Sequence, residues 1–149
     1  MDWERLYQKL PELDASVFDT LEAEFCAALY LSTAPNNRPA CVTAFLTIAN
    51  WVATSMRSGV WTFYEATPPA DLTATTCFLK EHGNDELASI FTSGIHEYQD
   101  PKFAGNYDYP EEWIVGADDI DQWISRHEAQ IHCLEKKILL ENQQLISSL

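Results

Sequence analysis

Histidines and carboxylates are the side chains of this sequence that can bind a metal ion. The four histidines are His82, His96, His127 and His132. His127 and His132 are five residues apart, so on a helix they point about 140° away from each other and cannot share an ion. Glu128 and His132 are four residues apart and can reach one ion together. Two ligands do not complete a site, so the sequence predicts no metal centre.

The sequence lacks the motifs of common enzymes. The acidic run over 118–121 has neither the glycine nor the terminal glutamate of a calcium-binding loop. No Gly-x-Ser-x-Gly, glycine-rich phosphate loop or His-Glu-x-x-His occurs, and the five glycines are scattered singly. The neighbouring Glu111 and Glu112 have nothing to separate their pKa values for acid–base work. We therefore expect a non-enzymatic protein without a cofactor.

Four cysteines, at positions 26, 41, 77 and 133, form no Cys-x-x-Cys pair. Most of them fall in apolar helical patterns, which is typical of reduced, packed thiols in a cytoplasmic protein. The first five residues carry acids where a secretory signal needs bases. The most apolar stretch, residues 40–53, is too short to cross a bilayer. These features predict a cytoplasmic protein.

Composition indicates one acidic globular domain. The chain has 149 residues, of which 46% are hydrophobic, enough for a single core. Its 23 acidic and 9 basic residues give a formal net charge of −14. That charge argues against direct binding to nucleic acid or to an anionic membrane.

Helical spacing of apolar residues recurs along the chain, and no segment alternates as a half-buried strand would. The sequence predicts an all-α, single-domain bundle of about five to seven helices. Ser16 with Asp19 resembles a capping box, Gly59 suits a helix end, and Asn84 suits a helix start. For 60–64 we favour a short helix over a strand. The expected helices cover 16–32, 40–58, 60–64, 67–82, 84–98 and 118 to the carboxyl end, with a long acidic and aromatic loop over 100–117.

Half of the net negative charge falls in residues 97–128, where nine acidic residues face only two basic ones and alternate with aromatic side chains. Such a surface can steer a cationic protein by its potential and hold it by aromatic contact. Helix capping and ordinary packing are the alternative explanation. The predicted partner-binding residues are Glu97, Asp100, Tyr107, Asp108, Tyr109, Glu111, Glu112, Trp113, Asp118, Asp119 and Asp121.

The last predicted helix carries a heptad-like apolar seam, interrupted by His127 and Glu141. The seam can pack on this domain's own helices, or its end can join a second copy of the chain. The residues predicted for a homodimer seam are Ile131, Leu134, Ile138 and Leu145.

The order of these elements resembles the DNA-mimic-protein-like bacterial family over roughly residues 40–146. The resemblance rests on a helix ending at 56–59, an aromatic run over 60–64, a helix pair split at 82–84 and the acidic run at 118–121. In that family the helix ends in an Asn-Gly-Gly-like turn, which is Arg57-Ser58-Gly59 here. The resemblance implies an all-helical acidic protein, often dimeric, with one characterised member that imitates DNA and occupies a transcription regulator.

We therefore expect a protein-interaction module that binds a basic DNA-binding protein through its carboxylates. An immunity protein that neutralises a basic toxin is the first alternative. A small-ligand-binding or enzymatic helical domain is the second.

Overall fold

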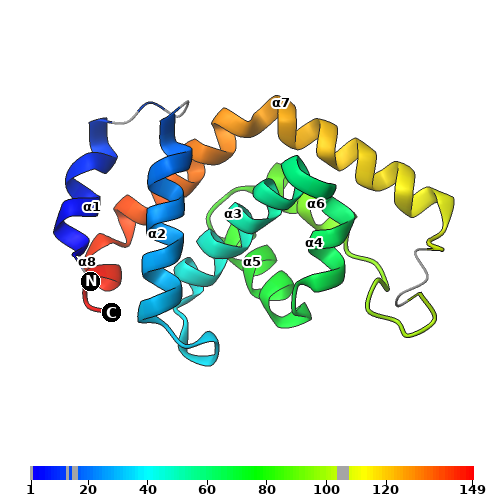
Figure 1. Ribbon diagram of the computed structural model, residues 1–149, viewed down its shortest axis with the longest axis horizontal. Helices are drawn as coiled ribbons and strands as arrows, with labels where there is room; N and C mark the ends of the chain where they lie inside the picture. Colours follow the sequence, from blue (N-terminus) through cyan, green and yellow to red (C-terminus); the bar gives the residue numbers. More distant parts are fainter. Residues whose placement is uncertain (1, 13, 15–16, 104–107) are drawn as a thin grey trace.

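Every regular element is helical in the part of the chain that the computed structural model describes, which is residues 2–12, 14, 17–103 and 108–149 (Figure 1). This confirms the predicted all-α domain with a long last helix. Among the described residues, short 3-10 turns lie at Leu10–Glu12 and Pro35–Asn37. The α-helices of the described residues are α1 (Trp3–Lys9), α2 (Phe18–Ser32), α3 (Ala40–Ser58), α4 (Val60–Ala66), α5 (Pro69–Glu81), α6 (Asp85–Ser93), α7 (Glu111–Glu141) and α8 (Gln143–Ser147).

Helix α3 forms the centre of the core. Pro39 stands at its N-cap and Gly59, with a φ of 85°, stands at its C-cap, because a proline cannot donate to a preceding turn and a glycine tolerates positive φ. The helix contacts α2, α4, α5 and α7. Most of its first half is therefore buried, whereas Asn50, Ala53 and Met56 in its second half are exposed.

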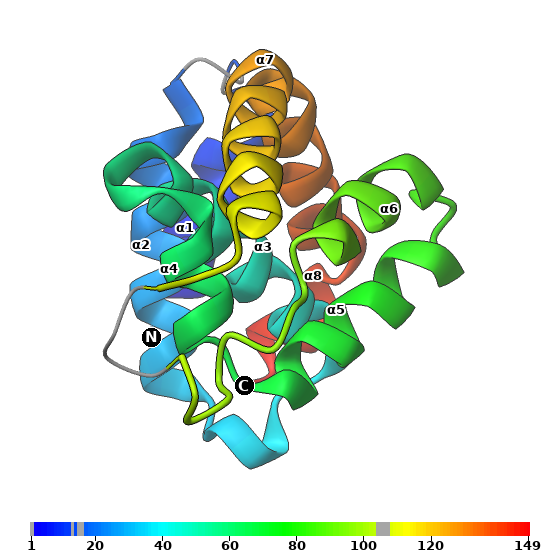
Figure 2. The ribbon, with the colours of Figure 1, turned by 90° about the vertical axis from the view of Figure 1, so that its right-hand side faces the viewer.

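Helix α7 runs along the length of the molecule (Figure 1). Its 31 residues span about 46 Å at 1.5 Å per residue. Helices α1, α2 and α8 lie toward its C-terminal end, and α4, α5 and α6 lie toward its N-terminal half (Figures 1 and 2). Tyr7 on α1 donates a hydrogen bond to the Leu139 carbonyl, which ties the first helix to the last part of α7.

The predicted loop over 100–117 is shorter than expected, since α7 begins at Glu111 rather than at Asp118. Pro110 occupies the N-cap, and the two glutamates of the first turn favour the positive end of the helix dipole. Gly116, which was assigned to the loop, lies within the helix. Near the other end the helix stops at Glu141, because the Asn142 side chain donates to the Ile138 carbonyl before α8 starts.

Two other predicted helix boundaries need correction. Thr67 closes α4 instead of capping α5, because its backbone N–H bonds the Phe63 carbonyl and Pro68 takes the N-cap of α5. The helix predicted over 84–98 ends at Ser93, where Gly94 packs against the Tyr64 ring. The predicted capping box at Ser16 lies outside the described residues.

The aromatic run over 60–64 is helical, as predicted. Its Tyr64 hydroxyl accepts a hydrogen bond from Trp51 Nε1 and donates one to the Phe91 carbonyl. All three residues are buried, so this bridge joins α3, α4 and α6 inside the core.

The predicted dimer seam lies largely within this chain's own core. Ile131 and Ile138 are buried, Leu134 is half-buried, and Leu145 is exposed. The first two have their partners in the same molecule, so only the end of the seam faces solvent. Dimerisation itself stays a prediction.

Among the described helices, none is both long enough and apolar enough to span a membrane.

Candidate functional site

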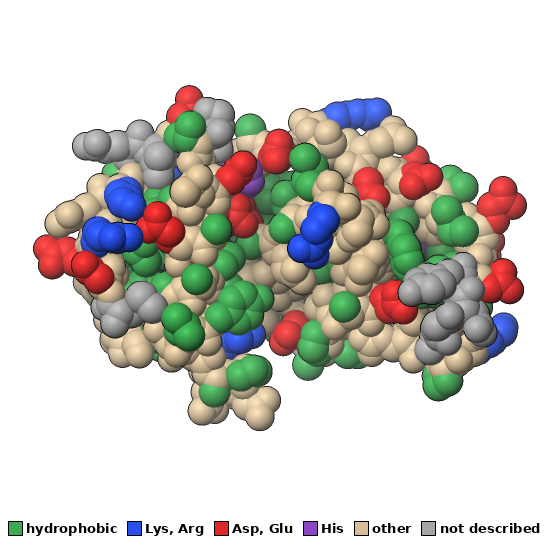
Figure 3. Space-filling view, viewed as in Figure 1, with side chains coloured by type: hydrophobic (Ala, Val, Ile, Leu, Met, Phe, Trp, Pro, Cys, Tyr) green, Lys and Arg blue, Asp and Glu red, His purple; other side chains and the backbone are tan. Residues whose placement is uncertain are grey.

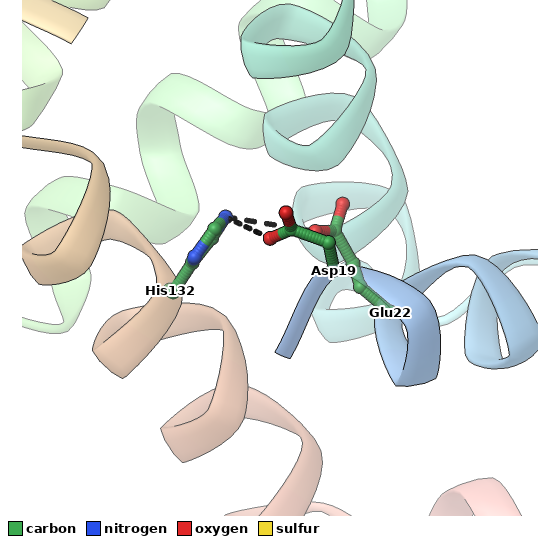
Figure 4. A group of neighbouring side chains, drawn as sticks. All are labelled: Asp19, Glu22 and His132. Carbon is green, nitrogen blue, oxygen red and sulfur yellow. Dashed lines mark ion pairs between the residues drawn. The ribbon is translucent and has the colours of Figure 1, made fainter. Parts of the chain in front are cut away.

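Two carboxylates of α2 and a histidine of α7 meet where these helices pack together (Figure 4). His132 Nε2 lies 3.5 Å from Asp19 Oδ1 and 3.7 Å from Glu22 Oε2. One ligand atom from each of the three residues lies within 4.8 Å of the other two. Ligands about 2.1 Å from a tetrahedral metal ion are about 3.4 Å apart, so the histidine–carboxylate spacing matches a shared ion.

Helical periodicity explains how each side chain reaches the cluster. Asp19 and Glu22 are three residues apart on α2, and Glu128 and His132 are four apart on α7, so each pair lies on one helix face. The Phe18 ring packs edge-on against the His132 ring, with centroids 5.6 Å apart. This contact fixes the imidazole in a site where only 5% of the residue is exposed.

Glu135, one helical turn after His132, is completely buried. Neither of its carboxylate oxygens has a hydrogen-bond partner among the described residues. Burial raises the pKa of this carboxyl well above its ordinary value, and the negative charges of Glu22 and Asp19 raise it further. A buried carboxylate without a partner is costly, so the residue needs either a proton or a cation.

Burial also raises the pKa values of two residues near Glu135, which are Glu22 and Cys26. Burial raises the pKa of the Glu22 carboxyl, and the nearby His132 opposes this shift. Burial also raises the pKa of the Cys26 thiol to about 12, so this cysteine stays protonated at neutral pH. The acidic groups therefore repel one another in a partly dry site, and His132 is the nearby group that can compensate them.

The cluster forms one wall of a cleft of about 470 Å³ between α2, α3 and α7. Its opposite wall comes from α3 and is mainly apolar, with Leu46, Ala49, Val52, Ala53 and Met56. Such a cavity is within the size range of small-molecule sites. An ion held by three protein ligands keeps a coordination position open, and the cleft gives that position access to a small ligand.

The donor set favours a first-row transition metal. Imidazole suits Zn²⁺, Fe²⁺ and Cu²⁺, whereas carboxylates suit Mg²⁺, Ca²⁺ and Mn²⁺. One imidazole with two carboxylates fits Zn²⁺, Mn²⁺ or Fe²⁺ better than an alkaline-earth ion, because the imidazole nitrogen is a poor ligand for Mg²⁺ and Ca²⁺.

Residue spacing along the sequence identifies only part of this cluster. It pairs Glu128 with His132 and indicates no further ligand, whereas the fold brings Asp19 and Glu22 to the same histidine. The helix-face spacing of Asp19 with Glu22, and of His132 with Glu135, was the available signal. This spacing does not show that α2 and α7 lie against each other in the fold.

The predicted partner-binding residues lie elsewhere, around the first half of α7 and the segment before it. Tyr109 is buried, Asp100 and Trp113 are half-buried, and Tyr107 lies outside the described residues. The exposed members are Glu97, Asp108, Glu111, Glu112, Asp118 and Asp119. On the face in Figure 3, acidic side chains occur from one end of the molecule to the other, not in a single patch.

Asp121 is only half-exposed and links α7 to the end of α3 and the start of α4. This structural role differs from the predicted role at a partner surface. Its carboxylate accepts hydrogen bonds from the Ser55 hydroxyl and from the backbone N–H of Val60, the first residue of α4. It therefore caps α4 from another helix, because the first N–H groups of a helix lack partners within it.

No protein-family model matches this chain, and searches of curated proteins and of solved structures found no significant match. The resemblance to the DNA-mimic-protein-like family therefore stays an expectation from the sequence.

Proposed function

We propose that this protein binds one divalent transition-metal ion between α2 and α7 and presents it to a small ligand in the adjoining cleft. Asp19, Glu22 and His132 supply the ligands. Glu135 supplies a further negative charge beside them. The observation that carries the proposal is the complete burial of the Glu135 carboxyl, without a hydrogen-bond partner among the described residues, next to three groups already spaced for one ion.

A bound cation would remove the electrostatic conflict within the cluster. It would compensate the charges of Glu22 and Glu135, whose pKa values are raised mainly by burial. Its ligands must lose their protons, so metal affinity should rise with pH. The competing arrangement has no ion, and His132 pairs directly with Asp19 and Glu22.

The test is a titration of chelator-treated full-length protein with Zn²⁺ and Mn²⁺, and with Mg²⁺ as the comparison ion, followed by calorimetry. We expect one equivalent of Zn²⁺ or Mn²⁺ to bind, and Mg²⁺ to bind far more weakly. Changes to groups around a metal already weaken binding about 10- to 100-fold, so His132→Asn and Glu22→Gln should each weaken it at least tenfold.

His127→Asn is the matched control. This histidine lies on the same helix, and its ring bonds the Trp123 carbonyl instead of facing the cluster. The control should bind like the wild type. Failure of wild-type protein to bind near one equivalent, or equal weakening in the control, would rule out the proposed site. Circular dichroism of each variant separates lost binding from lost structure.

A second candidate is the interaction module predicted from the sequence, which would dock a basic DNA-binding protein or toxin. This candidate is supported by six exposed carboxylate side chains that make no ion pair within the described residues. They are Glu97, Asp108, Glu111, Glu112, Asp118 and Asp119. Binding to a purified lysine-rich protein should weaken strongly between low and high salt. Equal binding at both salt concentrations would remove the electrostatic mechanism.

A further inference from the structure

A second cavity, of about 230 Å³, lies near the N-terminal end of α7. Four aromatic side chains line it: Trp61 from α4, Tyr98 and Tyr109 from the segment between α6 and α7, and Trp113 from α7. Asp118 adds a carboxylate to the lining. Trp113 and His132 are 19 residues apart on α7, or about 28 Å, so this pocket is separate from the proposed metal site.

Three of the ring pairs in this lining meet at steep angles, whereas Tyr109 and Trp113 are closer to parallel, with centroids 6.1 Å apart and planes at 27°. Tyr98 and Tyr109 have centroids 5.1 Å apart with planes at 72°, and Tyr98 and Trp113 are 5.0 Å apart at 58°. Trp61 meets Tyr109 at 5.6 Å and 61°. Rings in one flat stack would leave no enclosed space, whereas rings at these angles can form the walls of a box.

The pocket has both a firm base and an opening to solvent. Tyr98 and Tyr109 are buried, with 2% and 8% of their surfaces exposed. Trp61 and Trp113 are half-buried, and Asp118 is exposed. A ligand would therefore meet preformed aromatic walls and a carboxylate near the solvent side.

The electrostatics of this lining favour a cation. The faces of aromatic rings carry negative potential, and Trp is the strongest cation–π acceptor. Asp118 is the one charged residue among the described lining residues. The adjoining Phe103, whose ring lies 5.0 Å from that of Trp113, already has the Lys102 ammonium 5.0 Å from its own centroid.

We propose that this pocket binds a methylated ammonium group, free or on a lysine side chain. Several aromatic faces around a cation are the arrangement that proteins use for quaternary ammonium. The methyl groups spread the positive charge and contact the apolar walls. The Asp118 carboxylate compensates the positive charge of the ammonium group. An ordinary lysine ammonium is compact and strongly hydrated, so it would lose more hydration on entering the box.

The decisive comparison uses choline and 3,3-dimethylbutan-1-ol, its uncharged isostere with carbon in place of nitrogen. Both compounds have the same shape, so a difference in affinity reports the charge. Tryptophan fluorescence and calorimetry of the full chain would measure binding. We expect choline to bind at least about tenfold more tightly, which is the range of a desolvated cation–π contact. Equal affinity for the two compounds would overturn the proposal.

Two variants locate the site. Asp118→Asn should weaken choline binding about three- to tenfold, while Asp119→Asn, an exposed neighbour outside the lining, should leave it unchanged. Trp113→Leu should weaken it at least tenfold. Because Asp118 is exposed, its variant keeps the fold even if the tryptophan variant is damaged. Unchanged binding in Asp118→Asn and in a folded Trp113→Leu would refute the assignment.

A trimethyllysine peptide distinguishes the source of the group. Binding of this peptide more tightly than of choline, and more tightly than of the unmethylated peptide, would identify a protein side chain as the ligand. Tighter binding of choline would identify a small molecule and still support the pocket. If neither compound binds, the proposal fails.

Discussion

Replacing Glu135 by glutamine should make the metal-free protein more stable at neutral pH. The wild-type carboxyl is fully buried and has no hydrogen-bond partner among the described residues. Glutamine has nearly the same shape and stays uncharged at every pH. It therefore keeps the packing and removes the cost of ionising a carboxyl in the core.

The sign follows from the raised pKa of the Glu135 carboxyl in the folded protein. Below the ordinary value of 4.5, the folded and unfolded states both carry the proton, and this group adds no pH dependence. Above it, the unfolded chain loses the proton while the folded protein keeps it, so stability falls as pH rises. The loss continues up to the folded-state pKa, with a slope of about 1.4 kcal/mol per pH unit.

Urea unfolding at pH 5, 6, 7 and 8, with a chelator present, measures this slope. The free energy of unfolding of Glu135→Gln should exceed that of wild type by a margin that widens with pH by up to about 1.4 kcal/mol per unit. In melting temperature this is about 3–6 °C per unit. Glu141→Gln, an exposed residue of the same helix, is the control for losing a carboxylate at the surface.

Metal should narrow the gap in stability between the two proteins. An ion at 100 times its dissociation constant stabilises the folded state by about 2.7 kcal/mol, and Glu135→Gln should receive less of this gain. A gap that is constant with pH, or a variant that is less stable at every pH, would show that the Glu135 carboxyl is not the isolated buried group described above. Equal stabilisation of both proteins by metal would remove Glu135 from the metal site.

Three further substitutions test the packing around the sites. Asp121→Ala should lower the free energy of unfolding by about 1–2 kcal/mol in urea titrations, because Val60 N–H loses the carboxylate that caps α4; no change would mean that water replaces the cap. Gly94→Ala should lower it by about 1–3 kcal/mol, because the new Cβ would overlap the Tyr64 ring. Gly116→Ala, where nothing lies within 4 Å, should instead raise it by about 0.5–1 kcal/mol in the same assay; equal effects of the two glycine substitutions would contradict the packing.

The sequence predicted best the elements whose ends carry strong local signals. Helix α3 lies between Pro39 and Gly59, and both its ends were predicted correctly because each residue restricts the backbone by itself. The start of α7 was missed because Pro110 and Gly116 both resemble loop residues. Packing on α3 and α4 compensates the weak helix propensity of that glycine.

The sites were harder to predict because they depend on contacts between distant segments. Asp121 looked like one more surface acid, and its bond to Val60 exists only because α7 crosses the start of α4. His132 lacked enough ligands within its own helix, and the missing ones come from α2. Tyr109 and Trp113 were singled out from sequence, but their arrangement around a pocket depends on Trp61. Spacing along one helix predicts a face, whereas the partner of that face is set by the tertiary fold.

The proposed metal site joins residues more than a hundred positions apart in the chain. During synthesis α2 leaves the ribosome long before α7. Asp19 and Glu22 are therefore present before His132 has been made. Ion loading would then be restricted to chains whose last long helix has emerged and docked. A nascent or truncated chain without α7 would stay metal-free, and occupancy would distinguish finished molecules from unfinished ones.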